Sequence, residues 1–283
     1  MQSLKINTEK LITSKWLYDH LDDPSIRIIE VGSGSNKTYQ KSHIPGAIWW
    51  FWKDHCWHDT DRQFVTPEKL AQDLGKVGIS PDNTLVLYGD PVQYGNYAFW
   101  VFTMAGHADI RLLDGSRTKW ESEGLEMTTK TLEFAPVSYS PQTPNETMRI
   151  GRKNILDNLK NPNRLLLDMR SPEEYSGERV IEYGFFDHGA ERGGRIPGAK
   201  HLHYKDLLND DDSYKSADEL QTLFNAIGVI KNSKIEIVCY CRLSHRASLA
   251  WFALTHILGY EGVKIYDGSW TEWGSIVGVP IEK

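Results

Sequence analysis

Cysteine is scarce in this sequence: its 283 residues include only Cys56, Cys239 and Cys241. An odd number this small does not build a disulfide framework, and it favours a reducing compartment. Long apolar runs are missing as well. No stretch approaches the ~20 residues that a transmembrane helix needs, and residues 1–21 lack the apolar core of a secretory signal. We therefore expect a cytoplasmic protein with no membrane partner.

Positive charge is also in short supply. Lys and Arg number 32 against 38 Asp and Glu, the formal net charge is −6, and no basic run occurs. This balance argues against a nucleic-acid partner, although it is compatible with a local site for a small anion. The segment His55-Cys56-Trp57-His58 lacks a clear fourth metal ligand, and no phosphate-binding glycine motif is present. The sequence predicts neither a metal nor a cofactor.

An internal repeat is the most informative feature that the sequence does contain. Residues 43–49, HIPGAIW, match residues 195–201, RIPGAKH. Residues 105–120 match residues 258–273 at a constant offset of 153. That period is far longer than a solenoid repeat, so the chain reads as two copies of one domain. We predict domains at 1–125 and 147–283, joined by a linker at 126–146 that has three prolines and no helical period.

Each copy alternates short apolar runs with longer helical segments. The apolar runs cover 26–31, 84–89 and 110–115 in the first copy and 164–169, 234–240 and 262–268 in the second. Turn residues bound them, as is typical of buried strands. The segments 94–107 and 245–260 are long enough for helices. This alternation predicts an α/β fold with two domains, each a mainly parallel β-sheet flanked by helices.

The second copy contains an insertion. Ile28 and Ile44 are 16 positions apart, whereas the equivalent Leu166 and Ile196 are 30 apart, so the second copy has about 14 additional residues. The inserted segment carries Arg179, Arg192 and Arg195. An insertion of this length is either a functional loop or a neutral surface feature, and the sequence leaves both open.

Cys241 lies in the segment that we expect to carry the chemistry. It directly follows a predicted strand, and a helix begins within a few residues. A helix N-terminus and the permanent charges of Arg242 and Arg246 favour a thiolate, which is the nucleophilic form of cysteine. Ser244 is a candidate N-cap for the helix. A tight turn before a helix also aims backbone N–H groups inward and forms an anion nest.

Each of these cysteines could be reactive or merely a buried part of the structure. A structural, buried cysteine suits Cys239, which sits within the predicted strand, better than it suits Cys241. The first copy has no cysteine at the equivalent place, where Gly89 and Asp90 stand. We therefore predict a catalytic second domain and a non-catalytic first domain that supplies one wall of a cleft.

Four stretches carry a family resemblance. YQKSHIPGA (39–47) is similar to the N-terminal signature of rhodaneses, and VKIYDGSWTEW (263–273) to their C-terminal signature. CRLSHR (241–246) lies where rhodaneses place a six-residue catalytic loop, and LDMRSPEEYSG (167–177) resembles their Asp-x-Arg segment. Over nearly its whole length, the chain resembles the tandem-domain rhodaneses, which are thiosulfate and 3-mercaptopyruvate sulfurtransferases.

The resemblance implies a mechanism and a set of site residues. Cys241 would take the outer sulfur of thiosulfate as a persulfide and pass it to cyanide or to a thiol. The substrate-binding residues implied are Arg242, Ser244, His245 and Arg246. The residues expected to brace the loop or to line the cleft are Asp168, Arg170, Arg195 and Tyr94.

The loop composition favours thiosulfate as the donor. In the family that the chain resembles, the catalytic loops of mercaptopyruvate sulfurtransferases have small, neutral residues. The CRLSHR loop instead carries two arginines and a histidine. Ser244 stands where many members of the family have glycine, the residue that adopts a positive φ at little cost. This departure keeps 3-mercaptopyruvate open as an alternative donor.

Two other functions are compatible with parts of the sequence. Protein tyrosine phosphatases also use a cysteine loop that ends in arginine, but they place five residues between the two, and here four separate Cys241 from Arg246. A shorter loop forms a smaller nest for a phosphate. A non-enzymatic scaffold or sulfur carrier is the second alternative, against which the intact CRLSHR loop argues.

Overall fold

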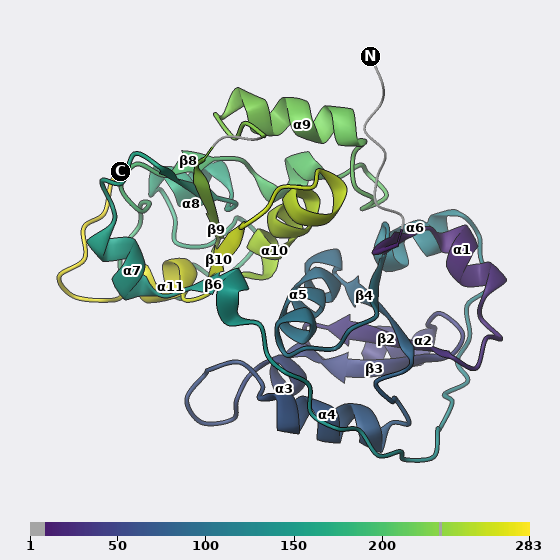
Figure 1. Ribbon diagram of the computed structural model, residues 1–283. Coiled ribbons are helices and arrows are strands. Elements are labelled where there is room, and N and C mark those ends of the chain that lie inside the picture. Colours follow the sequence, from purple (N-terminus) through teal and green to yellow (C-terminus); the bar gives the residue numbers. More distant parts are fainter. Residues whose placement is uncertain (1–8, 232–233) are drawn as a thin grey trace. The chain divides into compact units, whose positions relative to one another are not determined.

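The computed structural model describes residues 9–231 and 234–283, which form two compact units (Figure 1). The first unit contains the described residues 9–146 together with Asp210–Tyr214. The second contains Thr147–Asn209 and the described part of Lys215–Lys283. Each unit is built around one five-stranded sheet in which every pair of neighbouring strands is parallel.

The first unit orders its strands β1-β5-β4-β2-β3. The strands are β1 (Leu11–Ile12), β2 (Ile26–Gly32), β3 (Ala47–Phe51), β4 (Thr84–Asp90) and β5 (Ile110–Leu113). The helices are α1 (Ser14–Asp19), α2 (Lys37–Lys41), α3 (Trp52–Cys56), α4 (Pro67–Lys76), α5 (Val92–Met104) and α6 (Ser116–Ser122). The central strands β2 and β4 are almost entirely buried, which explains their continuous apolar sequences.

The second unit repeats this order as β6-β10-β9-β7-β8. Its strands are β6 (Arg149–Ile150), β7 (Arg164–Asp168), β8 (Lys200–His201), β9 (Glu236–Tyr240) and β10 (Lys264–Tyr266). Its helices are α7 (Arg152–Asp157), α8 (Pro172–Ser176), α9 (Ala217–Ala226), α10 (His245–Phe252) and α11 (Ser269–Trp273), with a π-helical turn η3 (Ala253–Ile257) and 3₁₀ turns η1 (Glu146–Met148) and η2 (Tyr204–Leu207). The matching strand orders confirm the predicted α/β fold of two tandem domains.

Of the predicted elements, two differ most from those observed. The helix predicted over 245–260 is α-helical only to Phe252, and a π-helical turn follows it. The strand predicted over 262–268 is shorter, because the chain turns at Asp267 and Gly268 to enter α11. This turn brings the start of α11 to the end of β9, which matters for the site described below.

The segment 126–146 lies along the first unit. The backbones of His43 and Thr128 exchange two hydrogen bonds of 2.8 and 2.9 Å, and the Val137 N–H donates to the Gly75 carbonyl at 2.9 Å. The Asn145 N–H donates to the Met104 carbonyl at 2.7 Å. Backbone contacts of this kind hold the segment in place without a regular element of its own from 126 to 145.

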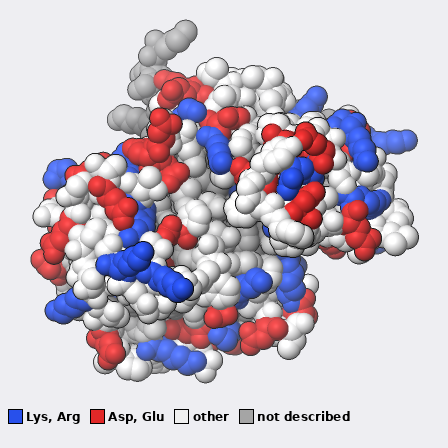
Figure 2. All heavy atoms as spheres, turned by 180° about the vertical axis from the view of Figure 1, so that it is seen from behind, with Lys and Arg blue, Asp and Glu red and all other residues white. Residues whose placement is uncertain are grey.

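Charge is distributed evenly over the surface in view. On the face drawn in Figure 2, acidic and basic side chains are interspersed, and neither sign covers a continuous area. Among the residues that the structure describes, no helix has the length and apolar character required to cross a bilayer.

A buried carboxyl lies in the core of the first unit. Glu30 in β2 is 1% exposed, accepts a 2.5 Å hydrogen bond from the Tyr88 hydroxyl and lies 3.4 Å from the Arg117 guanidinium. Burial raises the pKa of Glu30 to about 7, although the Tyr88 hydrogen bond and the Arg117 charge act in the opposite direction. Below about pH 7 the carboxyl is therefore mostly protonated in the folded state.

We predict that Glu30 makes the stability of the first unit fall as the pH rises. The pKa of Glu30 is about 7 in the folded chain against an ordinary value of 4.5, so between these values only the unfolded chain releases the proton. The loss amounts to about 3 kcal/mol across this window. Unfolding of wild type and Glu30→Gln, compared from pH 4.5 to 8, should show the wild type losing stability relative to the variant. Parallel profiles would contradict the assignment.

Candidate active site

Cys241 lies at the carboxyl end of the central strand β9, where open parallel sheets place their ligands. Its side chain is buried, with 1% of the residue exposed, and α10 begins four residues later at His245. Cys239 is inside β9, and burial raises the pKa of its thiol far above the ordinary value. Burial has the same effect on the pKa of Cys56. Cys241 is thus the one cysteine of the three that follows a strand and precedes a helix.

Ser244 has the backbone conformation that a glycine would adopt at little cost. Its φ is 72° and its ψ −14°, in the left-handed region. Its Oγ donates to the Asp267 carbonyl at 2.9 Å and lies 3.3 Å from Ser269 Oγ. Ser244 is thus the N-cap residue of α10, as predicted, but its hydroxyl does not make the expected hydrogen bond to the first turn of that helix. The side chain instead ties the loop to the turn before α11.

The start of α11 holds the backbone of Cys241 at both its N–H and its carbonyl. The Cys241 N–H donates to Ser269 Oγ at 3.2 Å, and the Cys241 carbonyl accepts from the Trp270 N–H at 2.9 Å. The Thr271 N–H donates to the Arg242 carbonyl at 3.1 Å. Residues of the motif VKIYDGSWTEW therefore fix the path of the CRLSHR loop through these backbone contacts.

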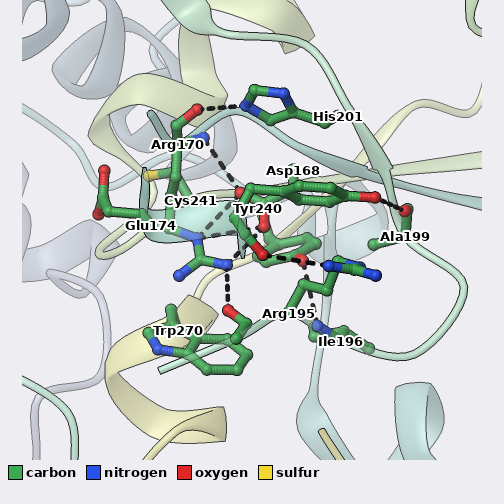
Figure 3. Close-up of polar contacts among 12 residues, drawn as sticks. Asp168, Arg170, Glu174, Arg195, Ile196, Ala199, His201, Tyr240, Cys241 and Trp270 are labelled. Atoms are coloured by element: carbon green, nitrogen blue, oxygen red, sulfur yellow. Dashed lines mark hydrogen bonds and ion pairs between the residues drawn. The ribbon is translucent and has the colours of Figure 1, made fainter. Parts of the chain in front are cut away.

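Asp168 and Arg170 form an ion pair beneath the loop (Figure 3). Both side chains are 0% exposed, and Arg170 Nη2 donates to Asp168 Oδ2 at 2.6 Å and to the Gly194 carbonyl at 2.7 Å. The guanidinium also lies over the Trp270 ring, 4.4 Å from its centre. The pair thus connects the end of β7, the end of the insertion and α11, which is the geometry that a bracing role requires.

Arg246 faces a buried carboxylate. Its Nη1 and Nη2 donate to the two carboxylate oxygens of Glu174 at 2.6 and 2.8 Å. Burial would raise the pKa of Glu174, but the hydrogen bonds and charge of Arg246 hold it below the ordinary value. Glu174 also closes a capping box with Ser171 at the start of α8. The ion pair therefore fastens α8 to the first turn of α10.

The other predicted site residues lie in separate places. His245 is the first residue of α10 and is 8% exposed. Arg195 binds Glu282 in the last residues of the chain and lies 4.5 Å from the centre of the Tyr175 ring. Arg195 therefore braces the C-terminal segment. Tyr94 belongs to α5 of the first unit, where its ring lies 5.9 Å from that of Trp52, and its place in a cleft stays a prediction.

Sequence reasoning missed the residues that hold the loop in place. The one sequence signal at Glu174 is its capping-box spacing of three residues from Ser171, which says nothing of its contact with Arg246. Ser269 and Trp270 belong to a recognised motif, yet no pattern assigns their bonds to Cys241. Gly189, in the insertion, had no sequence signal.

Comparison with known proteins identifies the relatives of this chain. A model of the Rhodanese-like domain matches residues 13–123 and 152–276. The chain belongs to the rhodanese family. A relative from Thermus thermophilus, "Sulfur carrier protein TtuD", is 41% identical to this rhodanese over 279 residues, which cover 97% of each chain. A second, from Haloferax volcanii and named "Putative thiosulfate sulfurtransferase", is 39% identical and covers 96% of each.

Solved structures share the fold of this rhodanese. The anaerobic ergothioneine biosynthesis enzyme from Chlorobium limicola, in complex with trimethyl histidine, matches with a TM-score of 0.83 and 23% identity. The match covers 100% of this chain and 72% of that one. At this level of identity the likeness establishes the fold alone. Family membership places the chain among the rhodanese-like sulfurtransferases.

The two rhodanese domains differ at the position of Cys241, whose structural equivalent in the first domain is Gly89. The Gly89 N–H donates to Ser116 Oγ at 2.7 Å, as the Cys241 N–H does to Ser269 Oγ. A Cβ at Gly89 would lie 2.4 Å from the Gly95 backbone nitrogen. The start of α5 therefore packs directly onto the strand end, and the first domain has no room there for a side chain.

Proposed function

We propose that this rhodanese is a thiosulfate sulfurtransferase that carries sulfur as a persulfide on Cys241. The observation that carries the proposal is the position of Cys241 between β9 and α10, in a loop whose backbone is fixed by α11. The N-terminus of a helix stabilises the thiolate form of a cysteine beside it. The same N-terminus can bind an anionic donor.

The reaction proceeds in two displacements. The Cys241 thiolate attacks the outer sulfur of thiosulfate, the sulfur–sulfur bond of the donor breaks, and sulfite leaves with the bonding electron pair. Cyanide or a thiol then attacks the outer sulfur of the persulfide. The new sulfur–sulfur bond breaks in turn, the acceptor takes the sulfur, and the Cys241 thiolate is regenerated.

The two loop arginines have different tasks in this proposal. Arg242 lies directly after the nucleophile and is partly exposed, so it contacts the sulfonate of the donor. Both terminal nitrogens of Arg246 bind Glu174, so Arg246 holds the loop in place. It adds positive charge near Cys241 without binding the donor directly. Ser244 and His245 contribute the backbone N–H groups of the turn and of the first residue of α10.

We predict that Arg242→Ala and Arg246→Ala affect the two sulfur donors differently. Arg242→Ala should lower kcat/KM for thiosulfate about 30-fold, because a hydrogen bond between charged groups contributes roughly 2 kcal/mol. Its effect on 3-mercaptopyruvate should be smaller. Arg246→Ala should lower both values by similar factors, since it disturbs the loop itself. Wild-type use of 3-mercaptopyruvate in preference to thiosulfate would instead support the alternative donor.

A sulfur-carrier role is a second candidate, favoured by the name of the Thermus thermophilus relative, a sulfur carrier protein. A carrier would form the same persulfide but would deliver its sulfur to a dedicated acceptor. Turnover with cyanide or small thiols tests the difference. A persulfide that forms from thiosulfate yet resists every small acceptor would favour the carrier role.

A further inference from the structure

The insertion of the second domain is fastened to the same elements that hold the catalytic loop. The Arg192 guanidinium donates to four backbone carbonyls at 2.8–3.1 Å, those of Trp273, Gly274, Ile276 and Val279. In return, Trp270 Nε1 donates to the Arg192 carbonyl at 3.0 Å. Because Trp270 also binds the Cys241 carbonyl, the insertion and the nucleophile share one support.

One residue of the insertion lies directly against the catalytic loop. Gly189 has a φ of +105°, and a Cβ built on it would lie 2.2 Å from Arg242 Nη2 and 2.8 Å from Nε. The guanidinium packs against the bare Gly189 backbone, and because it is the end of a flexible side chain, a side chain at position 189 would displace it. The absence of a side chain at position 189 therefore sets where the guanidinium can lie.

The first domain lacks both members of this contact. It has Asp90 after Gly89, where the second domain has Arg242 after Cys241, and its loop between β2 and β3 is the shorter one. The insertion and the loop arginine therefore occur together, in the domain that carries the thiol. This pairing within one chain argues that the insertion serves the site.

We propose that Gly189 is a positioning residue for the sulfur donor: it leaves Arg242 in the orientation that receives an oxyanionic sulfur donor. The proposal rests on the proposed function for its substrate, a sulfonate-bearing donor such as thiosulfate. Gly189 acts through Arg242 and touches no substrate itself. Any side chain at position 189 displaces the guanidinium and weakens recognition of the anion, while the thiol and its support by α11 remain.

The chain provides a matched control for this position. Gly184 is in the same insertion and also has a positive φ, +91°, but nothing lies within 4 Å of the Cβ that it would carry. Gly184→Ala therefore introduces comparable backbone strain without meeting Arg242. Gly189→Ala introduces the strain and the clash together, so the difference between the two variants isolates the contact.

The first readout is the kinetics of the two half-reactions. Gly189→Ala should lower kcat/KM for thiosulfate roughly ten-fold through a higher KM, less than the hundred-fold that a misplacement of ~1 Å can cost. Its kcat/KM for cyanide should stay near the wild-type value, which also shows that the variant is folded. Gly184→Ala should stay near wild type for both substrates. Equal behaviour of the two alanine variants would overturn the proposal.

The second readout does not depend on sulfur transfer. Iodoacetate is anionic and iodoacetamide is neutral, so the ratio of their alkylation rates at Cys241 reports attraction of an anion by Arg242. Gly189→Ala should lower this ratio several-fold, Gly184→Ala should leave it unchanged, and Arg242→Ala should lower it as much as Gly189→Ala does. If thiosulfate proves not to be a donor, the proposed function fails, and this ratio still decides the role of Gly189.

A double variant completes the test. In an Arg242→Ala background the atoms that the new methyl group would meet are gone, so Gly189→Ala should cause no further loss in either readout. The double variant should also fold at least as well as Gly189→Ala alone. A further loss of the same size in that background would show that Gly189 acts independently of Arg242, and the inference would be wrong.

Discussion

Cys241→Ser is expected to lower kcat/KM for the transfer of sulfur from thiosulfate to cyanide by roughly a thousand-fold or more, the scale seen when a covalent nucleophile is removed. The reason is the position of the thiol between β9 and α10. A serine hydroxyl there stays protonated at neutral pH and does not form a persulfide.

Cys239 provides the control for this prediction. It is two residues away, inside β9, and burial raises the pKa of its thiol so far that it does not supply a thiolate at neutral pH. Cys239→Ala should therefore keep sulfurtransferase activity within a few-fold of wild type. If Cys241→Ser kept its turnover, or if Cys239→Ala lost it, the nucleophile would be misassigned.

Glu174→Gln is expected to destabilise the second unit by about 3 kcal/mol, because the buried Arg246 cation loses its two short bonds to Glu174 and keeps the longer contact of 3.7 Å with Glu182. The variant should also take up sulfur about ten-fold more slowly, since the first turn of α10 carries the end of the catalytic loop. Urea unfolding of the full chain and the rate of sulfite release from thiosulfate measure the two effects. A Glu174→Gln variant with wild-type stability and wild-type rate would contradict the role of the pair.

A double-mutant cycle separates this ion pair from general damage to the core. Arg246→Met removes the cation, and in combination with Glu174→Gln it removes both charges of this pair, so the double variant should be less destabilised than the sum of the two single variants. Lys153 and Asp157, in α7 of the same unit, form a solvent-exposed ion pair for comparison. Asp157→Asn should leave the unfolding midpoint unchanged within error.

The sequence was sufficient to predict the fold because its evidence is local. Short apolar runs bounded by turn residues predict strands, and the offset of 153 predicts that the second domain repeats the first. The structure confirms both, with corresponding strand orders in the two sheets. The position of Cys241 after a strand and before a helix follows from the same local patterns.

The contacts that support the loop could not be predicted, because their partners are far apart in the chain. Glu174 and Arg246 are separated by 72 positions, and no periodicity relates them. Gly189 and Arg242 lie close together in the fold, where Arg192 of the same insertion donates to backbone carbonyls within residues 273–279. Patterns of composition indicate which residues are charged, but the fold decides which charges face one another.

Ser244 shows how a departure from a family pattern is accommodated. The resemblance places glycine at this position in many rhodaneses, and the observed φ of 72° explains that preference. Here the hydroxyl compensates by donating to the Asp267 carbonyl, a bond that glycine would not make. The loop thus keeps its left-handed turn with a serine, and the path of the backbone around Cys241 does not depend on a glycine.

Intact-protein mass spectrometry tests the central claim most directly. After treatment with thiosulfate and removal of small molecules, the wild type should gain the mass of one sulfur atom, peptide mapping should place it on Cys241, and cyanide should remove it. Cys241→Ser should gain nothing, whereas Cys239→Ala should gain the same single sulfur. No gain in the wild type, or a gain that persists in Cys241→Ser, would contradict the persulfide on Cys241.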